Sequence, residues 1–141
     1  MISNCRMLEF KRFSGNLGAL TAVEGERDIP FPVRRVYYIT DVPGDATRGF
    51  HAHQALEQVL ICLHGTIKIR VKTPFEEDTI TLSENSTGLY IGNMIWREMF
   101  DFTPGAVLMV LASDYYSEDE YIRNYKEYLR EATTYFGGEN K

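Results

Sequence analysis

The chain has 141 residues with 20 acidic and 15 basic side chains, so its formal net charge is −5, and this length suits one domain with its own core. The acidic balance argues against nucleic acid as a partner, because phosphate backbones are bound by basic surfaces. Two cysteines are too few for a disulfide scaffold, and with no signal-peptide or membrane-spanning apolar run we expect a cytoplasmic protein without a membrane partner.

Short strands separated by turns are predicted for the first third of the chain. Apolar residues favour a strand over residues 7–13 and a shorter one near 20–24, with glycines around them. β-branched and aromatic residues predict a further strand over 33–40. Since successive side chains of a strand point to opposite faces, this strand places Arg35 and Tyr37 on the same face.

The middle of the chain continues the strand pattern. Residues 57–63 and 66–72 are predicted to form a hairpin with His64 and Gly65 at its turn. Turn signals recur at roughly the 8–12-residue spacing of all-β sandwiches and barrels, which favours a jelly-roll-like β domain. Further strands are predicted at 79–82, 89–91, 95–100 and 106–111.

The C-terminal region changes to a helical pattern. Residues 117–120 read Ser-Glu-Asp-Glu, the form of a capping box, and apolar residues follow at helical spacing from Tyr121 onward. Gly137 and Gly138 are the expected stop. We therefore predict a single domain over residues 1–141, with a β-barrel over about 7–113 and a C-terminal helix over about 117–134.

Two of the three histidines, His51 and His53, lie at positions i and i+2 after the turn-forming segment 41–45. On a strand their imidazoles, with pKa values near 6.5, would project side by side. One interpretation is structural, with both rings bonded to backbone. A second is a metal site completed by Glu57, although residues 92–97, where metal-binding cupins bring a further histidine, contain none.

The third interpretation is acid/base catalysis without a metal. Such catalysis needs a base with a pKa near neutrality, a group that returns the proton, and donors that stabilise developing negative charge. His51 and His53 can fill the first two roles. The third role falls to Tyr37, Arg48 and Arg97 if their strands line the same cavity.

Three further side chains are weaker candidates. Trp96 is more often a core or pocket-wall residue than a catalytic one, but it can also stack on a flat ring. Gln58, at the start of a strand after the histidines, can orient a ligand hydroxyl. Arg35 can help to hold a small anionic ligand, because the planar guanidinium fork suits anionic groups such as phosphate.

Several stretches of the chain together resemble the nucleotide-sugar 3,4-ketoisomerases of the cupin superfamily, which act on dTDP-4-keto-6-deoxy-D-glucose. The resemblance runs from about residue 8 to residue 130. Its most specific parts are an Arg-Gly-x-His-Ala-His motif and an aromatic-Ile-Arg tail. The matching stretches include residues 34–39, 47–53, 58–61, 88–91, 96–99 and 120–125.

This resemblance implies a cupin jelly-roll β-barrel with a C-terminal helix, a homodimer that exchanges N-terminal strands, and a sugar nucleotide in the barrel mouth. It also implies catalysis without a metal or other cofactor. His51 and His53 take the positions of the family's paired histidines, Tyr37 that of its active-site tyrosine, and Arg48 that of its motif arginine. Leu17 departs from the family, because some relatives carry a larger polar side chain there.

The expected activity is movement of the keto group of dTDP-4-keto-6-deoxy-D-glucose from C4 to C3 through an enediolate. The product would feed synthesis of a 3-amino-3,6-dideoxy sugar for surface polysaccharide such as O-antigen or an S-layer glycan. Alternatives are a dTDP-sugar 3,5-epimerase-like enzyme, a non-catalytic nucleotide-sugar-binding cupin, and a metal-dependent dioxygenase. The expected catalytic residues are His51, His53 and Tyr37, and the expected substrate-binding residues are Arg48, Arg97, Arg35, Gln58 and Trp96.

Overall fold

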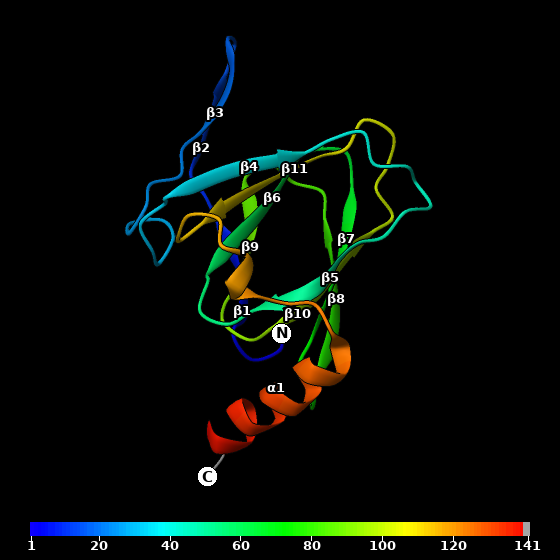
Figure 1. The fold of residues 1–141 in the computed structure, drawn as a ribbon. Helices are drawn as coiled ribbons and strands as arrows, with labels where there is room; N and C mark the ends of the chain where they lie inside the picture. The colour runs from blue at the N-terminus through cyan, green and yellow to red at the C-terminus, as the bar shows by residue number, and fades with distance from the viewer. Residues whose placement is uncertain (140–141) are drawn as a thin grey trace.

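The computed structural model describes residues 1–139 and shows two antiparallel five-stranded sheets that enclose a common core (Figure 1). The first sheet has the strand order β1-β9-β6-β11-β4, and the second has the order β12-β5-β10-β7-β8. The predicted all-β jelly roll with a C-terminal helix is confirmed. The strands are β1 Cys5–Glu9, β2 Arg12–Gly15, β3 Gly18–Thr21, β4 Arg35–Ile39, β5 Arg48–His53, β6 Gln58–His64, β7 Ile67–Lys72, β8 Glu77–Leu82, β9 Thr87–Ile91, β10 Trp96–Phe100, β11 Val107–Ala112 and β12 Tyr121–Ile122.

Alternation along the strands builds the core. In β7 the odd-numbered residues from Ile67 to Val71 are fully buried, whereas the intervening lysines and arginine lie on the outer face. A second apolar cluster lies on the outer face of the first sheet, where Phe10, Ile29 and Phe31 cover Val59 and Ile61. Among residues 1–139 no helix is long and apolar enough to cross a membrane.

The predicted hairpin between residues 57–63 and 66–72 is wrong, because β6 and β7 belong to different sheets. Gly65 turns the chain with a φ of +77°, a conformation that favours glycine. The backbone N–H of Thr66 then donates to the hydroxyl oxygen of Thr103 at 2.8 Å. This corner is therefore tied to the loop before β11, and the chain crosses the core instead of folding back on itself.

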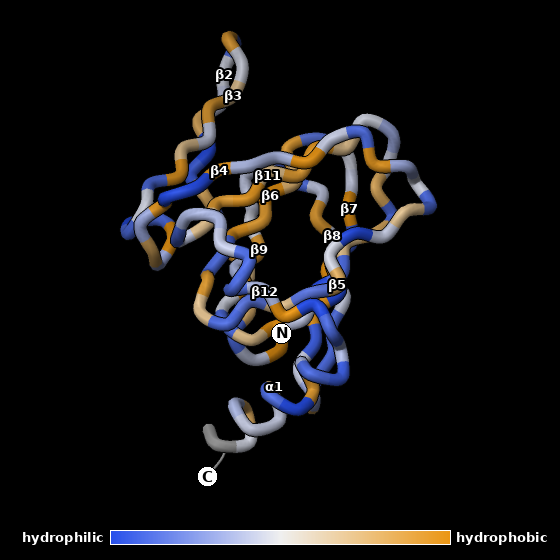
Figure 2. Tube along the Cα trace, in the orientation of Figure 1, coloured by the Kyte–Doolittle hydropathy of each residue, from blue (hydrophilic) through white to orange (hydrophobic). Residues whose placement is uncertain are grey.

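The predicted strand over residues 7–13 is also divided. Its first part is β1, which pairs with β9, and its second part is β2, which pairs with β3 in a hairpin that projects from the barrel (Figure 1). We call this hairpin the arm. Figure 2 shows apolar residues toward its tip, and the side chains of Phe13, Leu17 and Leu20 are exposed there. Within residues 1–139 the arm has no apolar cluster packed against it.

The C-terminal helix begins later than predicted. Helix α1 spans Tyr125–Glu139, so it runs through Gly137 and Gly138 instead of stopping before them. Ahead of it lie a 3₁₀ turn over Glu118–Glu120 and the short strand β12. The Ser117 side chain makes no capping hydrogen bond, and the Asn124 side chain accepts from the backbone N–H of Glu127 at 3.0 Å instead.

The predicted capping box fails because its glutamate has a tertiary partner. One carboxylate oxygen of Glu120 accepts hydrogen bonds from the backbone N–H groups of Ala55 at 2.7 Å and Leu56 at 2.8 Å. These contacts hold the segment along the edge of β5, where Tyr121 lies opposite His53. Tertiary pairing thus replaces the first turns of the predicted helix.

Candidate active site

A bulge in β5 directs both histidines toward the barrel interior. The pairing of β5 with β10 shifts register between Arg97 and Glu98. Gly49 has a φ of +98° at this place, and a β-carbon added to it would lie 2.8 Å from the carbonyl oxygen of Arg97. Phe50 also has a positive φ, of 56°. Bulges beside active sites re-aim side chains, and this one requires glycine.

A cavity of about 380 Å³ opens in front of the histidine strand. Strand β4 contributes the predicted face of Arg35 and Tyr37, strand β5 contributes Arg48 and His51, and the segment after the barrel contributes Tyr121. A volume of this order is typical of small-ligand sites. The lining residues are Arg35, Tyr37, Tyr38, Ile39, Arg48, Gly49, His51, Met99, Tyr121 and Arg123.

The two imidazoles lie edge to face, with ring centroids 4.9 Å apart and planes at 81°. His53 is fully buried, and within residues 1–139 neither of its ring nitrogens has a hydrogen-bond partner; the same holds for Nδ1 of His51. Burial, and then the nearby Arg97 cation, lowers the pKa of His51 to about 3. The same two causes lower the pKa of His53, so both rings are neutral near pH 7. The expected pKa near neutrality is therefore wrong for both histidines in the free protein.

Behind the cavity, three side chains form a hydrogen-bonded row. Arg97 donates through one guanidinium nitrogen to the side-chain oxygen of Gln58 at 2.6 Å, and the Gln58 amide donates to the hydroxyl of Tyr37 at 3.2 Å. Burial raises the pKa of Tyr37, which keeps its hydroxyl protonated and able to donate. Arg97 and Gln58 thus lie beneath the cavity wall, where they orient Tyr37.

Arg97 is buried without a neutralising carboxylate. Its remaining donors reach the backbone carbonyl oxygen of Ile95 at 3.1 and 3.3 Å. Within residues 1–139 no ion pair involves it. A buried cation of this kind creates a positive potential in the barrel interior, which suits developing negative charge in the adjacent cavity.

The mouth of the cavity is basic and aromatic. The Arg35 guanidinium lies over the rings of Tyr37, 4.6 Å from its centroid, and of Tyr116, at 5.1 Å. The Arg123 guanidinium pairs with both carboxylate oxygens of Glu118, at 2.8 and 3.2 Å. With Arg48, these cations give a locally positive site on an acidic protein, as binding of a diphosphate requires.

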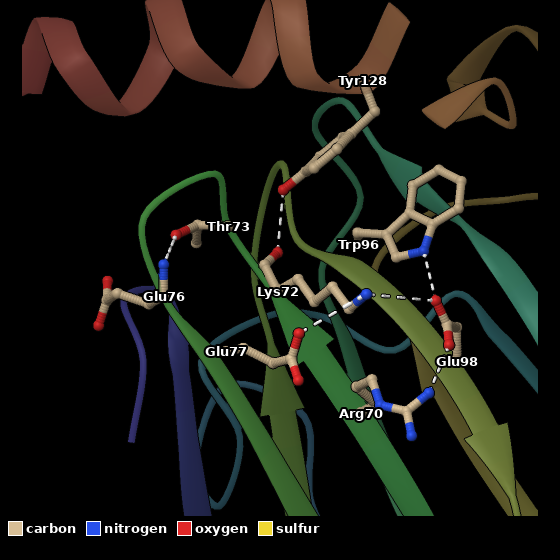
Figure 3. A network of polar contacts seen from close by, with 8 residues as sticks. All are labelled: Arg70, Lys72, Thr73, Glu76, Glu77, Trp96, Glu98 and Tyr128. Atoms are coloured by element: carbon tan, nitrogen blue, oxygen red, sulfur yellow. Dashed lines mark hydrogen bonds and ion pairs between the residues drawn. The ribbon is translucent and has the colours of Figure 1, made fainter. Parts of the chain in front are cut away.

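The structure contradicts the prediction that Trp96 contacts the substrate. Adjacent residues of a strand point to opposite faces, so Trp96 lies on the outer face of β10 while Arg97 lies inside. The indole N–H donates to Glu98 at 3.0 Å, and its ring packs against Tyr128 of α1 (Figure 3). Trp96 is therefore a core residue beneath the helix.

The metal alternative lacks its third ligand. Glu57 lies on the outer face of the first sheet, where its carboxylate accepts a hydrogen bond from the hydroxyl of Tyr90 at 2.5 Å. Residues 1–139 contain no group of three or more His, Cys, Asp or Glu side chains arranged to hold a metal ion. The predicted combination of His51, His53 and Glu57 is not assembled.

Six lining residues are absent from the predicted set, and the two that lie after the barrel are Tyr121 and Arg123. The helical spacing of the C-terminal tyrosines assigned Tyr121 to a packing face of the helix, whereas it lies on β12 beside the histidines. The aromatic-Ile-Arg tail was the available signal. The family shares this motif. Tyr121 and Arg123 are not part of the apolar core, so their presence in the motif indicates a role in the site.

Comparison with known proteins agrees with the geometry. The family FdtA, described as WxcM-like, C-terminal, matches residues 3–133. A TDP-4-oxo-6-deoxy-alpha-D-glucose-3,4-oxoisomerase from Aneurinibacillus thermoaerophilus is 46% identical over 127 residues, which cover 88% of this chain and 91% of that protein.

Solved structures agree as well. A mutant of the 3,4-ketoisomerase QdtA from Thermoanaerobacterium thermosaccharolyticum, in complex with TDP-4-keto-6-deoxyglucose, matches with a TM-score of 0.95 at 55% identity, covering 96% of this chain and 99% of that one. The WlaRB TDP-quinovose 3,4-ketoisomerase from Campylobacter jejuni matches with a TM-score of 0.88 at 46% identity, covering 92% and 99%. The chain therefore belongs to the FdtA family and is an enzyme of the sugar-nucleotide 3,4-ketoisomerase group that its motifs resemble.

Proposed function

We propose that this protein converts dTDP-4-keto-6-deoxy-D-glucose to the corresponding 3-keto sugar by acid/base catalysis without a metal. The observation that carries the proposal is that the neutral imidazole of His51, the protonated Tyr37 and several arginines line one cavity, with the neutral imidazole of His53 in contact with His51. The similarity to the TDP-sugar 3,4-oxoisomerase and to QdtA supports the choice of substrate.

The reaction moves two hydrogens and leaves the carbon skeleton unchanged. A base removes the proton on C3, which is acidic because C3 is adjacent to the C4 ketone, and an enediolate forms. A proton is then delivered to C4 while the oxygen on C3 becomes the new ketone. We assign His51 as the base, because its ring lines the cavity, and the fully buried His53 as its partner.

Negative charge on the enediolate needs donors at fixed positions. Tyr37 is held by Gln58 and Arg97, and Arg48 lines the same cavity. Each such donor can lower the barrier by roughly 3 kcal/mol. Arg35 and Arg123 lie at the mouth, where they can hold the diphosphate of the nucleotide.

We further propose that the protein is a homodimer in which the arms are exchanged. The support is the arm itself, because Phe13 and Leu20 expose large apolar surfaces on a hairpin that pairs with no other strand of the described chain. A second copy would cover them. The dimer would act in the cytoplasm, where the two free thiols, Cys5 and Cys62, stay reduced, in synthesis of a 3-amino-3,6-dideoxy sugar.

The test is an NMR time course with dTDP-4-keto-6-deoxy-D-glucose in D₂O with a chelator present. The proposal predicts a 3-keto sugar that carries deuterium at C4, and its couplings give the C4 configuration. Exchange at C3 and C5 with the ketone still at C4 would show an epimerase instead. Binding without any exchange would show a nucleotide-sugar-binding cupin, and activity that disappears with the chelator would show a metal enzyme.

A further inference from the structure

Strand β12 has an unusual position for so short an element. It consists only of Tyr121 and Ile122, and it pairs with the edge of β5 that β10 does not occupy. Tyr121 lies opposite His53, and Ile122 lies opposite Ala52. The strand therefore borders directly on the pair of histidines.

Hydrogen bonds of Glu120 at its start, and burial of its own residue Ile122, hold β12 in place. The Glu120 carboxylate accepts from the backbone N–H groups of Ala55 and Leu56, and the Glu120 carbonyl oxygen accepts from the N–H of Gln54 at 3.1 Å. The side chain of Ile122 is buried in the core. These contacts set the position of Tyr121 independently of any ligand.

The Tyr121 ring contacts both imidazoles. Its centroid lies 4.9 Å from that of His51 and 4.4 Å from that of His53. The Arg123 guanidinium lies over the same ring, 4.2 Å from its centroid, and is itself held by Glu118. Among residues 1–139 the structure gives the Tyr121 hydroxyl no hydrogen-bond partner, so its contacts with the protein are made by the ring.

We propose that Tyr121 is a positioning residue whose ring, and not its hydroxyl, holds His51 and His53 in place and shields them from water. The inference rests on the proposed function for its kinetic consequences. Its consequence for the histidines themselves holds in the free protein. His53 has no polar protein partner to orient its ring, so packing against Tyr121 and His51 performs that task.

The shield matters because burial is the largest cause of the lowered pKa values of both histidines. A smaller side chain at position 121 would admit water, and the charged imidazolium would then be solvated, which raises the pKa toward its ordinary value. The surrounding cations oppose this rise and limit it. The charged or titratable groups around the pair are Arg97 on β10, Arg35 and Tyr37 on β4, Arg48 on β5, and Glu118 and Arg123 beside β12.

The test compares Tyr121→Phe, which keeps the ring, with Tyr121→Leu, which removes it. Tyr115→Leu is the matched control, because Tyr115 is an exposed tyrosine outside the cavity lining. We expect Tyr115→Leu to behave like the wild type, and Tyr121→Phe to lose far less kcat than Tyr121→Leu. For Tyr121→Leu we expect kcat to fall about 10- to 100-fold with KM little changed, since small displacements of catalytic groups have effects of that order.

The second readout is the titration of the imidazole ¹⁵N signals in the free protein between about pH 5 and pH 8, where an unshielded histidine titrates. We expect no titration of His51 and His53 in the wild type or in Tyr121→Phe, and titration in Tyr121→Leu. This readout needs no turnover, so it separates failure of this proposal from failure of the proposed function.

Equal losses of kcat in Tyr121→Phe and Tyr121→Leu would overturn the proposal, because the hydroxyl would then be the active group. Unchanged titration in a folded Tyr121→Leu protein would overturn it as well. If circular dichroism shows that Tyr121→Leu is unfolded, Glu120→Ala replaces it, because this change removes two of the three hydrogen bonds that fix the start of β12 and leaves the ring unaltered. Wild-type titration and kcat in Glu120→Ala would then reject the proposal.

Discussion

Strand β10 carries a buried charged side chain on each of its two faces, but only the one on the outer face is paired with opposite charges. On the outer face Glu98 accepts hydrogen bonds from Arg70 at 2.7 Å and from Trp96 at 3.0 Å (Figure 3). The ammonium nitrogen of Lys72 lies 3.9 Å from the Glu98 carboxylate. On the inner face Arg97 has no carboxylate partner within residues 1–139. Arg97 and Glu98 are adjacent in sequence and differ in environment because they point to opposite faces of the strand.

The outer network is matched in charge and closed by the helix. Lys72 also pairs with Glu77 at 3.6 Å, and the Tyr128 hydroxyl of α1 donates to the carbonyl oxygen of Lys72 at 2.9 Å. Every member has a partner, as is usual for buried polar groups that stabilise a fold. This side of β10 attaches the helix to the barrel.

The inner face carries polar groups that the fold leaves unpaired. In the described part of the chain the ring nitrogens of His53 have no hydrogen-bond partner, and the nearby Arg97 cation has no counter-ion. Unpaired buried polar groups lower stability, so their presence indicates function. The comparison teaches that polar satisfaction, more than burial or residue type, distinguishes the structural cluster from the catalytic one.

The largest expected effect comes from His51→Asn on the inner face. Loss of the proposed base should lower kcat by about 10²- to 10⁴-fold, with binding of dTDP little changed, as measured by the NMR assay and by calorimetry. His64→Asn is the control, because this third histidine is exposed at the end of β6. Equal activity in wild type and His51→Asn would remove His51 from the mechanism.

Arg97→Met should lower activity strongly and stability only slightly. Without Arg97 the Gln58 amide loses its fixed position and Tyr37 is no longer held, so we expect kcat to fall about 10- to 100-fold. Removal of the second cause of the lowered pKa of His51 should also move the acid limb of the pH–rate profile upward. The free energy of unfolding should change by only about 1 kcal/mol, because an unneutralised buried cation contributes little. An unchanged acid limb would contradict this assignment.

Glu98→Gln, on the outer face, should do the opposite and lower stability while activity stays close to that of the wild type. Loss of the carboxylate weakens its bonds with Arg70 and Trp96, which we expect to lower the free energy of unfolding by about 1–3 kcal/mol. Because Glu98 faces away from the cavity, kcat should stay close to that of the wild type. Urea denaturation and the NMR assay measure the two quantities. A large loss of kcat in a stable Glu98→Gln protein would erase the difference between the two faces.

The last expected effect concerns stability alone: the inner face makes the free energy of unfolding depend on pH. His51 and His53 have lower pKa values in the folded protein than in the unfolded chain. Below about pH 6.5 the unfolded chain therefore binds more protons, and stability falls with pH by up to about 1.4 kcal/mol per pH unit for each histidine. We expect this loss between about pH 6.5 and pH 3, the lowered value for His51.

Urea denaturation at about pH 7 and pH 5 checks this slope. The double variant His51→Asn/His53→Asn serves as the control, because its difference from the wild type removes the contribution of the carboxylates. The slope should be smaller in the double variant. Equal slopes would mean that the two imidazoles are already charged or solvated in the folded protein.

The sequence predicted which side chains share a face of a strand more accurately than it predicted the connections between elements. Alternation correctly placed Arg35 and Tyr37 on one face, and the two-residue spacing of His51 and His53 brought their rings together. These predictions concern neighbours within one strand, where the geometry of the backbone determines which side chains share a face. The same rule would have separated Trp96 from Arg97.

The failures occurred where one segment met another. The helical spacing after Ser117 was compatible with a longer helix, but Glu120 finds its partners 64 and 65 residues earlier in the chain. Likewise β6 and β7 have the composition of a hairpin, yet they join different sheets because the corner at Gly65 is tied to Thr103. Neither partner is visible from the local sequence.

The sequence by itself determined the strand faces, the jelly-roll class and the paired histidines, because these depend on periodicity and on a local motif. The tertiary structure alone decided that Arg97 would lack a counter-ion and that Tyr121 would lie against both imidazoles. Both depend on contacts between segments far apart in the chain. The low pKa values of the histidines follow from that burial, since the free energy of a charge depends on its surroundings.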